Sequence, residues 1–111
     1  MTSPVDILLG DAREVLRTLP AASAHCVVTS PPFYGRVRDY GVAALWWGGD
    51  QAHEHVAVVG DTCFCGAWRG QLGHEAAPDT YIAPLMEVVR EVRRVLRADG
   101  VLWIGIADSY T

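Results

Sequence analysis

Apolar residues along the chain follow two spacings, which predict alternating strands and helices. Short apolar runs at residues 5–9, 25–29 and 101–106 have the length of buried strands. Between them, apolar residues recur three and four positions apart over residues 12–19 and again over residues 85–96, as in amphipathic helices. The predicted order is therefore strand, helix and strand, followed after a gap by a second helix and a third strand.

Proline and glycine set the expected ends of the helices. Pro20 stops the first helix, and Pro84 must lie in the first turn of the second, because proline disrupts a helix interior. Gly100 follows Arg97-Ala98-Asp99 and suits a left-handed helix cap, so we expect the second helix to close there.

Strands that alternate with helices are typical of an α/β fold, here a parallel sheet with flanking helices. Ligands of such sheets bind beyond the carboxyl ends of the strands. Three polar segments occupy those ends, so we expect them to converge in space: Gly10-Asp11, Ser30-Pro31-Pro32-Phe33 and Asp108-Ser109-Tyr110.

Residues 41–78 show neither helical nor strand periodicity. This stretch carries two of the cysteines, three of the four tryptophans and all but one of the histidines. We expect a loop or an insertion over about residues 45–79.

Four side chains in that stretch have the chemistry of zinc ligands: His53, His55, Cys63 and Cys65. Their number matches a closed tetrahedral site, and such a zinc would be structural. However, one residue separates the members of each pair, whereas two to four are usual, so a solvated loop with incidental ligands is the alternative. His74 is a spare candidate.

Composition limits the class of protein. The 111 residues are half hydrophobic, enough for one small core, and they contain neither a membrane-length apolar run nor a signal peptide. Three cysteines, an odd number, fit a reducing compartment, so we expect a soluble cytoplasmic protein.

The net charge of −4 speaks weakly against a nucleic-acid partner, because phosphate binding usually leaves a basic surface. The arginines of the second helix are Arg90, Arg93, Arg94 and Arg97. They share its surface with Glu87 and Glu91, which indicates a solvated face with a Glu91–Arg94 pair rather than a DNA contact.

Ser30-Pro31-Pro32-Phe33 carries the most specific chemistry. Two prolines fix φ near −65° and lack N–H groups, so the chain leaves the strand with its carbonyls turned outward. Such carbonyls suit an exocyclic amine, and an aromatic ring beside them could stack on an extruded base. An ordinary proline turn is the alternative.

These four residues resemble the catalytic motif of the amino-methyltransferases that modify cytosine N4 or adenine N6 in DNA. The likeness covers most of the chain outside residues 45–79, and its order resembles the permuted class in which the catalytic half precedes the cofactor half. Its other elements are Asp6–Asp11, Leu16, Leu19-Pro20, Tyr34-Gly35, Arg38–Gly41, Tyr81, Glu91–Gly100 and Trp103–Tyr110.

The resemblance implies a partial Rossmann-like methyltransferase fold, incomplete in this chain, with S-adenosylmethionine as donor and double-stranded DNA as substrate in a restriction–modification context. It implies that Ser30 and the Pro31 carbonyl accept hydrogen bonds from the target amine beside Pro32, while Phe33 stacks on the base. Serine at position 30 favours cytosine N4 in this family. Asp11 and Asp108 would contact the cofactor, although a helix N-cap is the alternative for Asp11.

A glycine-rich donor pocket, Phe-x-Gly-x-Gly in the resembled class, is missing from the 111 residues. We therefore expect an N-terminal catalytic portion that needs a C-terminal cofactor-binding half, in the same gene or as a partner chain. The alternatives are an adenine-N6 enzyme, an RNA or protein N-methyltransferase, and an inactive zinc-stabilised interaction module.

Overall fold

A computed structural model describes residues 4–35, 39–50 and 52–106. The elements in this part of the chain are, in order, α1 (Ala12–Arg17), β1 (Ala24–Thr29), β2 (Leu45–Trp47), β3 (Trp68–Gly70), α2 (Pro78–Val95) and β4 (Leu96–Ile104). Helices and strands are mixed, as the apolar spacing predicts.

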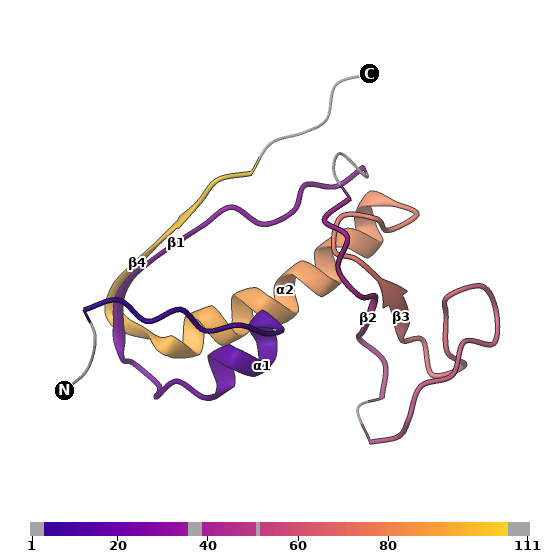
Figure 1. The fold of residues 1–111 in the computed structure, drawn as a ribbon, viewed down its shortest axis with the longest axis horizontal. Coiled ribbons are helices and arrows are strands. Elements are labelled where there is room, and N and C mark those ends of the chain that lie inside the picture. Colours follow the sequence, from indigo (N-terminus) through magenta and orange to yellow (C-terminus); the bar gives the residue numbers. More distant parts are fainter. Residues whose placement is uncertain (1–3, 36–38, 51, 107–111) are drawn as a thin grey trace.

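β1 and β4 pair in parallel, with Cys26 opposite Val101 and Thr29 opposite Ile104. Figure 1 shows the two strands side by side, with α2 running across the molecule below them. The Gly105 N–H extends the ladder by donating to the Thr29 carbonyl (N–O 2.9 Å). The predicted parallel pairing of these strands is confirmed, and their carboxyl ends lie next to each other.

The strand predicted at residues 5–9 is wrong. No strand is assigned within residues 4–10, where Ile7 and Leu9 are 92% and 100% exposed. A strand needs a hydrogen-bonded neighbour, and within the described residues β1 pairs only with β4. Apolar periodicity selects residues that suit a strand, but it does not supply the partner.

The second helix begins earlier than predicted. α2 starts at Pro78, so Pro84 lies in its interior rather than in its first turn. Proline suits the first helical position, and the Thr80 hydroxyl donates to the Ala77 carbonyl (Oγ1–O 2.8 Å) at this end. Leu85 and Val92, on the predicted apolar stripe, are buried.

The helix also ends differently. α2 stops at Val95, and Leu96 is already extended (φ −69°, ψ 140°), so Gly100 is not a left-handed cap. Gly100 lies in β4, where the register shifts between Ala24, opposite Leu96, and Cys26, opposite Val101. A Cβ at Gly100 would lie 2.9 Å from the Arg97 carbonyl of the same strand and 3.2 Å from the His25 carbonyl of β1, so glycine avoids crowding within β4 first and against β1 second.

The segment predicted as an aperiodic loop contains a β-hairpin. β2 and β3 pair antiparallel, with Leu45 opposite Gly70 and Trp47 opposite Trp68. Trp47 is buried, and its indole N–H donates to the Gly70 carbonyl (Nε1–O 3.0 Å). Strands of three residues are too short to show periodicity in sequence.

The buried core is small, and large apolar surfaces stay exposed. Its apolar members are Trp47, Cys63, Ala67, Tyr81, Leu85, Val92 and Val95. β1, predicted as buried, leaves Val28 77% exposed. The radius of gyration is 15.5 Å, against about 13 Å for a compact domain of this length. Within the described residues, no helix combines the length and apolarity needed to cross a bilayer.

Candidate active site

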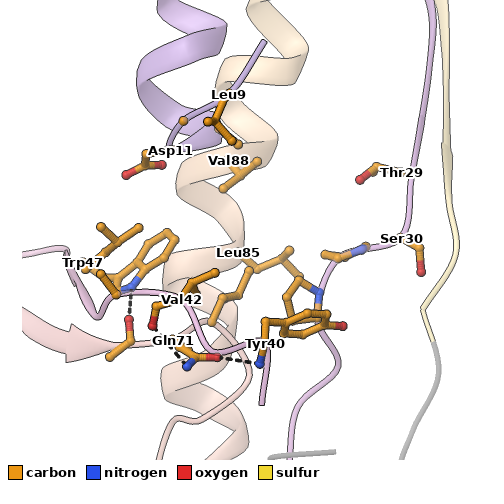
Figure 2. Close-up of a pocket in the computed structure, with 18 residues that line it drawn as sticks. Leu9, Asp11, Thr29, Ser30, Tyr40, Val42, Trp47, Gln71, Leu85 and Val88 are labelled. Atoms are coloured by element: carbon orange, nitrogen blue, oxygen red, sulfur yellow. Dashed lines mark hydrogen bonds between the residues drawn. The ribbon is translucent and has the colours of Figure 1, made fainter. Parts of the chain in front are cut away.

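A pocket of about 640 Å³ opens beside the carboxyl end of β1. Its walls come from the approach to α1, the end of β1, the β2–β3 hairpin with its neighbouring segments, and one face of α2; Figure 2 labels Leu9, Asp11, Thr29, Ser30, Tyr40, Val42, Trp47, Gln71, Leu85 and Val88. Small-molecule sites span about 300–1,000 Å³. The structure therefore brings Gly10-Asp11 and Ser30-Pro31-Pro32 together at a cavity of ligand size, as expected.

Ser30 lies directly after β1 and is exposed. Its hydroxyl is within 3.0 Å of the Gly105 carbonyl and donates to it, which links the ends of the two parallel strands. A hydroxyl has one proton and two lone pairs, so this bond leaves the Ser30 oxygen free to act as an acceptor. This bond is compatible with the acceptor role that the resemblance implies for Ser30.

The Pro32 carbonyl is held by α2. The hydroxyl of Tyr81, a residue only 4% exposed, donates to it (Oη–O 2.6 Å). Burial, and secondly the charge of Glu75, raise the pKa of Tyr81, so the phenol stays protonated and able to donate. Within the described residues, by contrast, nothing donates a hydrogen bond to the Pro31 carbonyl.

Phe33 is not among the residues that line the pocket. Its carbonyl lies against Gly73, where a Cβ would come within 2.5 Å of the oxygen and where φ is +99°. The Gly35 N–H donates to the Gly73 carbonyl (N–O 3.1 Å). The turn at Gly73 therefore fixes the backbone of Phe33, while the structure does not bring its ring into the cavity.

Glu75 supports the same turn from the interior. It is 4% exposed, and its Oε1 accepts from the Gly73 N–H at 2.7 Å, whereas its Oε2 is buried and unpartnered among the described residues. Burial raises the pKa of Glu75. Sequence reasoning missed this residue, because one acidic side chain in an aperiodic segment forms no pattern.

Asp11 caps α1 and lines the pocket. Its carboxylate accepts from the Arg13 backbone N–H (Oδ1–N 3.0 Å) and pairs with the Arg13 guanidinium (Oδ2–Nη2 2.8 Å). Burial opposes ionisation of Asp11, but the bonds and charge of Arg13 prevail and lower its pKa. The N-cap alternative is confirmed. Asp108 lies outside the described residues.

Arg13 was not identified from sequence, where an arginine early in a helix has no distinguishing signal. It is 9% exposed, and besides Asp11 it contacts Glu87 of α2 (Nη1–Oε2 3.2 Å) and the Trp46 carbonyl of β2 (Nη1–O 3.0 Å). Its guanidinium carbon lies 3.7 Å from the centroid of the Trp47 ring. Arg13 therefore joins three elements beside the pocket.

The four candidate zinc ligands lie together. One ligand atom from each of His53, His55, Cys63 and Cys65 falls within 4.8 Å of the others, and His55 Nδ1 lies 3.4 Å from Cys65 Sγ. His74 is not part of this group. Burial opposes ionisation of Cys65, but the backbone N–H groups of Asp50 and Ala67 and the side chains of His53 and Cys63 outweigh it and lower its pKa to about 7.

The single residue between the members of each pair, a spacing unusual for zinc, is turned outward. Glu54 and Phe64, the residues between the ligands, are exposed, Phe64 by 80%. Burial alternates over this stretch, which places both ligand pairs on the inner side.

The arginines of α2 form ion pairs and internal bonds. Arg94 pairs with Glu91 (Nε–Oε2 3.1 Å), as predicted, and also donates to the carbonyls of Leu16 and Leu19 at 2.7 and 3.0 Å. Arg97, predicted on the same helix, lies instead in β4, because α2 ends at Val95, and it pairs with Asp99 of the same strand (Nε–Oδ1 3.1 Å). These contacts agree with a charged, solvated helix face and provide no separate argument for a DNA-contacting surface.

Comparison with protein-family models and with solved structures gives no match. Curated proteins do match. Type II methyltransferase M.SmaI of Serratia marcescens is 38% identical over 105 residues, covering 95% of this chain and 27% of that protein. Type II methyltransferase M.XycI of Xanthomonas campestris pv. cyanopsidis is 37% identical over 102 residues, covering 92% and 25% respectively.

A more distant relative shows the same coverage of this chain. Type II methyltransferase M.MwoI of Methanothermobacter wolfeii is 34% identical over 104 residues, which is 94% of this chain and 12% of that protein. The chain thus spans about a quarter or less of the length of the curated relatives it matches. The resemblance to DNA methyltransferases is confirmed: over nearly its whole length, this chain is related to a part of the Type II methyltransferases.

Proposed function

We propose that the protein containing this chain is an S-adenosylmethionine-dependent DNA methyltransferase that methylates the exocyclic amine of an extruded base. The observation that carries the proposal is the position of Ser30-Pro31-Pro32, which follows β1 and lines a pocket of about 640 Å³. The relationship to Type II methyltransferases supports it. In this proposal the chain supplies the part that holds the reacting amine.

Two acceptors face the amine in the proposed mechanism. The Ser30 oxygen, whose proton is engaged by the Gly105 carbonyl, accepts one amine N–H, and the Pro31 carbonyl accepts the other. Together they orient the nitrogen lone pair, and such positioning is a large part of what a site contributes when the reacting electrophile comes from a cofactor. The new N–C bond would form as the methyl–sulfur bond of the donor breaks, with its electron pair passing to sulfur, and the methylated amine would release one proton to solvent.

The donor, when bound, supplies an electrophilic methyl group on a sulfonium sulfur. Asp11 lines the pocket and is proposed to contact the donor, as is Asp108 outside the described residues. The remaining donor site is proposed to come from a C-terminal cofactor-binding half, in the same gene or on a partner chain. That half would also complete a Rossmann-like sheet over the exposed apolar side chains of Ile7, Leu9 and Val28.

Phe33 is proposed to stack on the base once the base is extruded from the duplex. The Phe33 carbonyl packs against Gly73, which holds the backbone in place. The side chain is then the part that would rotate to stack on the base. The target is proposed to be cytosine N4, because Ser30 matches the residue found in the cytosine enzymes that the sequence resembles. Adenine N6 is the second candidate, and the mechanism of amine orientation would be the same.

Methyl transfer by the complete protein tests the proposal. Labelled S-adenosylmethionine is offered together with double-stranded DNA, RNA and protein, and the modified nucleoside is identified by mass spectrometry. We expect labelled N4-methylcytosine in DNA. Transfer to RNA or protein alone would contradict the DNA substrate, and N6-methyladenine would correct the base.

Ser30→Ala tests the site itself. Loss of one of the two acceptors misorients the amine, so we expect the turnover rate to fall on the order of 100-fold. Ser23→Ala is the matched control, since the Ser23 hydroxyl bonds the Pro20 carbonyl and does not line the pocket. Equal rates for the two variants would refute the role of Ser30.

A further inference from the structure

We propose that His53, His55, Cys63 and Cys65 bind one zinc ion in a closed tetrahedral site. Each residue offers one ligand atom, and the four atoms lie within 4.8 Å of one another. Two histidines and two cysteines are a common structural zinc set. The site is separate from the amine-binding pocket, since none of the four residues lines it.

The distances fit a metal-sized centre. Zn–S and Zn–N bonds of about 2.3 and 2.0–2.1 Å at a tetrahedral angle imply N···S separations of about 3.6 Å. The observed distance between His55 Nδ1 and Cys65 Sγ is 3.4 Å. The widest separation, 4.8 Å, requires a contraction of about 1 Å by comparison with that geometry. Rotation of the half-buried side chains of His53, His55 and Cys65 around the buried Cys63 can supply this contraction without moving a strand.

Charge also favours a metal over a solvated loop. Two thiolates neutralise the divalent cation, so the centre carries no net charge. The chain packs closely around one of these sulfurs, since Gly49 has φ +70° and a Cβ there would lie 2.8 Å from Cys65 Sγ.

His53 leaves a polar atom that a metal would satisfy. Its Nε2 is buried and has no hydrogen-bond partner among the described residues. A buried polar atom without a partner costs free energy, and in native structures it calls for an explanation. Its ring lies 4.8 Å from that of His55, centroid to centroid, so the nitrogen without a partner belongs to a ring that packs within the ligand group.

The ion would hold one wall of the pocket. The ligands lie in the connection between β2 and β3, and the Cys63-Phe64-Cys65-Gly66 turn is closed by a bond from the Gly66 N–H to the Cys63 carbonyl (N–O 2.9 Å). The hairpin that this connection joins supplies Trp47 and Gly70 to the pocket. This connection buries few apolar side chains, so a bound metal would supply the stabilisation that a hydrophobic core does not give it.

Metal content and cobalt spectroscopy of the complete protein test the site. We expect about one zinc per chain after purification under reducing conditions without chelator. Replacement by Co²⁺ should give the absorption of a tetrahedral cobalt–thiolate centre, which Zn²⁺ then displaces. Trp46 packs against His55 with ring centroids 5.1 Å apart, so tryptophan emission should change when a chelator removes the ion.

Single substitutions assign the ligands. Cys63→Ser, Cys65→Ser, His53→Ala and His55→Ala should each weaken zinc binding by at least tenfold. Cys26→Ser and His74→Ala are the matched controls, because they make the same chemical changes outside the cluster. His53→Cys should retain the metal and add thiolate character to the cobalt spectrum, which separates loss of a ligand from failure to fold.

The proposal is overturned if the reduced wild-type protein contains no zinc and shows no tetrahedral cobalt spectrum. It is also overturned if Cys65→Ser binds zinc as tightly as Cys26→Ser. A protein that lacks zinc but forms a Cys63–Cys65 disulfide, detected by thiol titration, would assign the pair to redox chemistry instead. None of these readouts depends on methyl transfer, so they leave the proposed function untouched.

Discussion

Tyr34 and Tyr81 pack against each other, with ring centroids 5.9 Å apart, yet their hydroxyls have different surroundings. That of Tyr81 is part-buried and donates to the Pro32 carbonyl at 2.6 Å. That of Tyr34 is exposed and lies 3.5 Å from the Ala76 carbonyl. At the residue scale, Tyr81 is therefore a positioning residue for the proline loop.

Tyr81→Phe keeps the ring and removes the donor, which leaves the Pro32 carbonyl unpaired. We expect the free energy of unfolding to fall by about 1 kcal/mol, the usual cost of one such bond. We also expect the turnover rate to fall several-fold at nearly unchanged affinity for the methyl donor, because the loop loses its position rather than a ligand contact.

Denaturant unfolding and single-turnover methylation by the complete protein measure both effects. Tyr34→Phe is the control and should alter neither quantity, since its hydroxyl bond is long and exposed. If both variants lose turnover equally, the hydroxyl of Tyr81 does not position the loop.

At the element scale, Arg13 joins α1, α2 and β2. Its guanidinium contacts Asp11, Glu87 and the Trp46 carbonyl and lies over the Trp47 ring. Arg17, one turn further along α1, is a useful contrast: its side chain is 58% exposed and lies 3.8 Å from the Glu91 carboxylate.

Arg13→Met should lower the free energy of unfolding by about 3 kcal/mol, because it leaves two part-buried carboxylates without a partner. Arg17→Met should change it by less than about 1 kcal/mol, the value typical of an exposed ion pair. Urea unfolding at neutral pH distinguishes the two. If both variants lose a similar, small free energy of unfolding, Arg13 does not hold these elements together.

Asp11 gives the Arg13 network a pH dependence. Its pKa is lowered in the folded chain, so its pairing stabilises the fold above the pKa of the unfolded chain and is lost as pH falls through the folded value. The free energy of unfolding of Arg13→Met should therefore approach that of the wild type in strong acid, as urea unfolding at a series of pH values would measure.

At the scale of the whole molecule, the sheet is open. Val28 on β1 is 77% exposed. The radius of gyration is 15.5 Å, larger than the value of about 13 Å for a compact domain of this length. Under the proposed function, the remaining part of the enzyme covers this face. Val59, in the β2–β3 connection and 76% exposed, is not expected to be covered.

Val28→Thr should destabilise the complete protein by about 1–3 kcal/mol, because a buried hydroxyl would then lack a partner. In the 111-residue chain produced by itself, the same substitution should have little effect. Val59→Thr, with equal exposure and the same chemical change, should have little effect in both. Thermal unfolding of both variants, in the complete protein and in the 111-residue chain, measures these effects. Equal small shifts of the unfolding temperature in all four proteins would mean that β1 is not covered.

Sequence predicted the place of the proline segment after β1 better than the fold around it. Ser30-Pro31-Pro32 could be found because proline geometry acts within neighbouring residues and the segment follows a recognisable strand. Arg13, Glu75 and the position of Pro84 could not, since their environments depend on distant parts of the chain. The bond from Tyr81 to Pro32 spans 49 positions, and that from Arg13 to Glu87 spans 74.

The sequence by itself determined β1, the parallel partner at its side, the apolar face of α2 and the four residue types of the His/Cys cluster. These follow from local periodicity, from backbone limits of proline and from ligand chemistry. The tertiary structure decided which of them have partners. It formed no strand over residues 5–9, placed Gly100 within β4 beside β1, and brought ligand pairs eight residues apart to within 4.8 Å, because hydrogen bonding and burial depend on which distant segments meet.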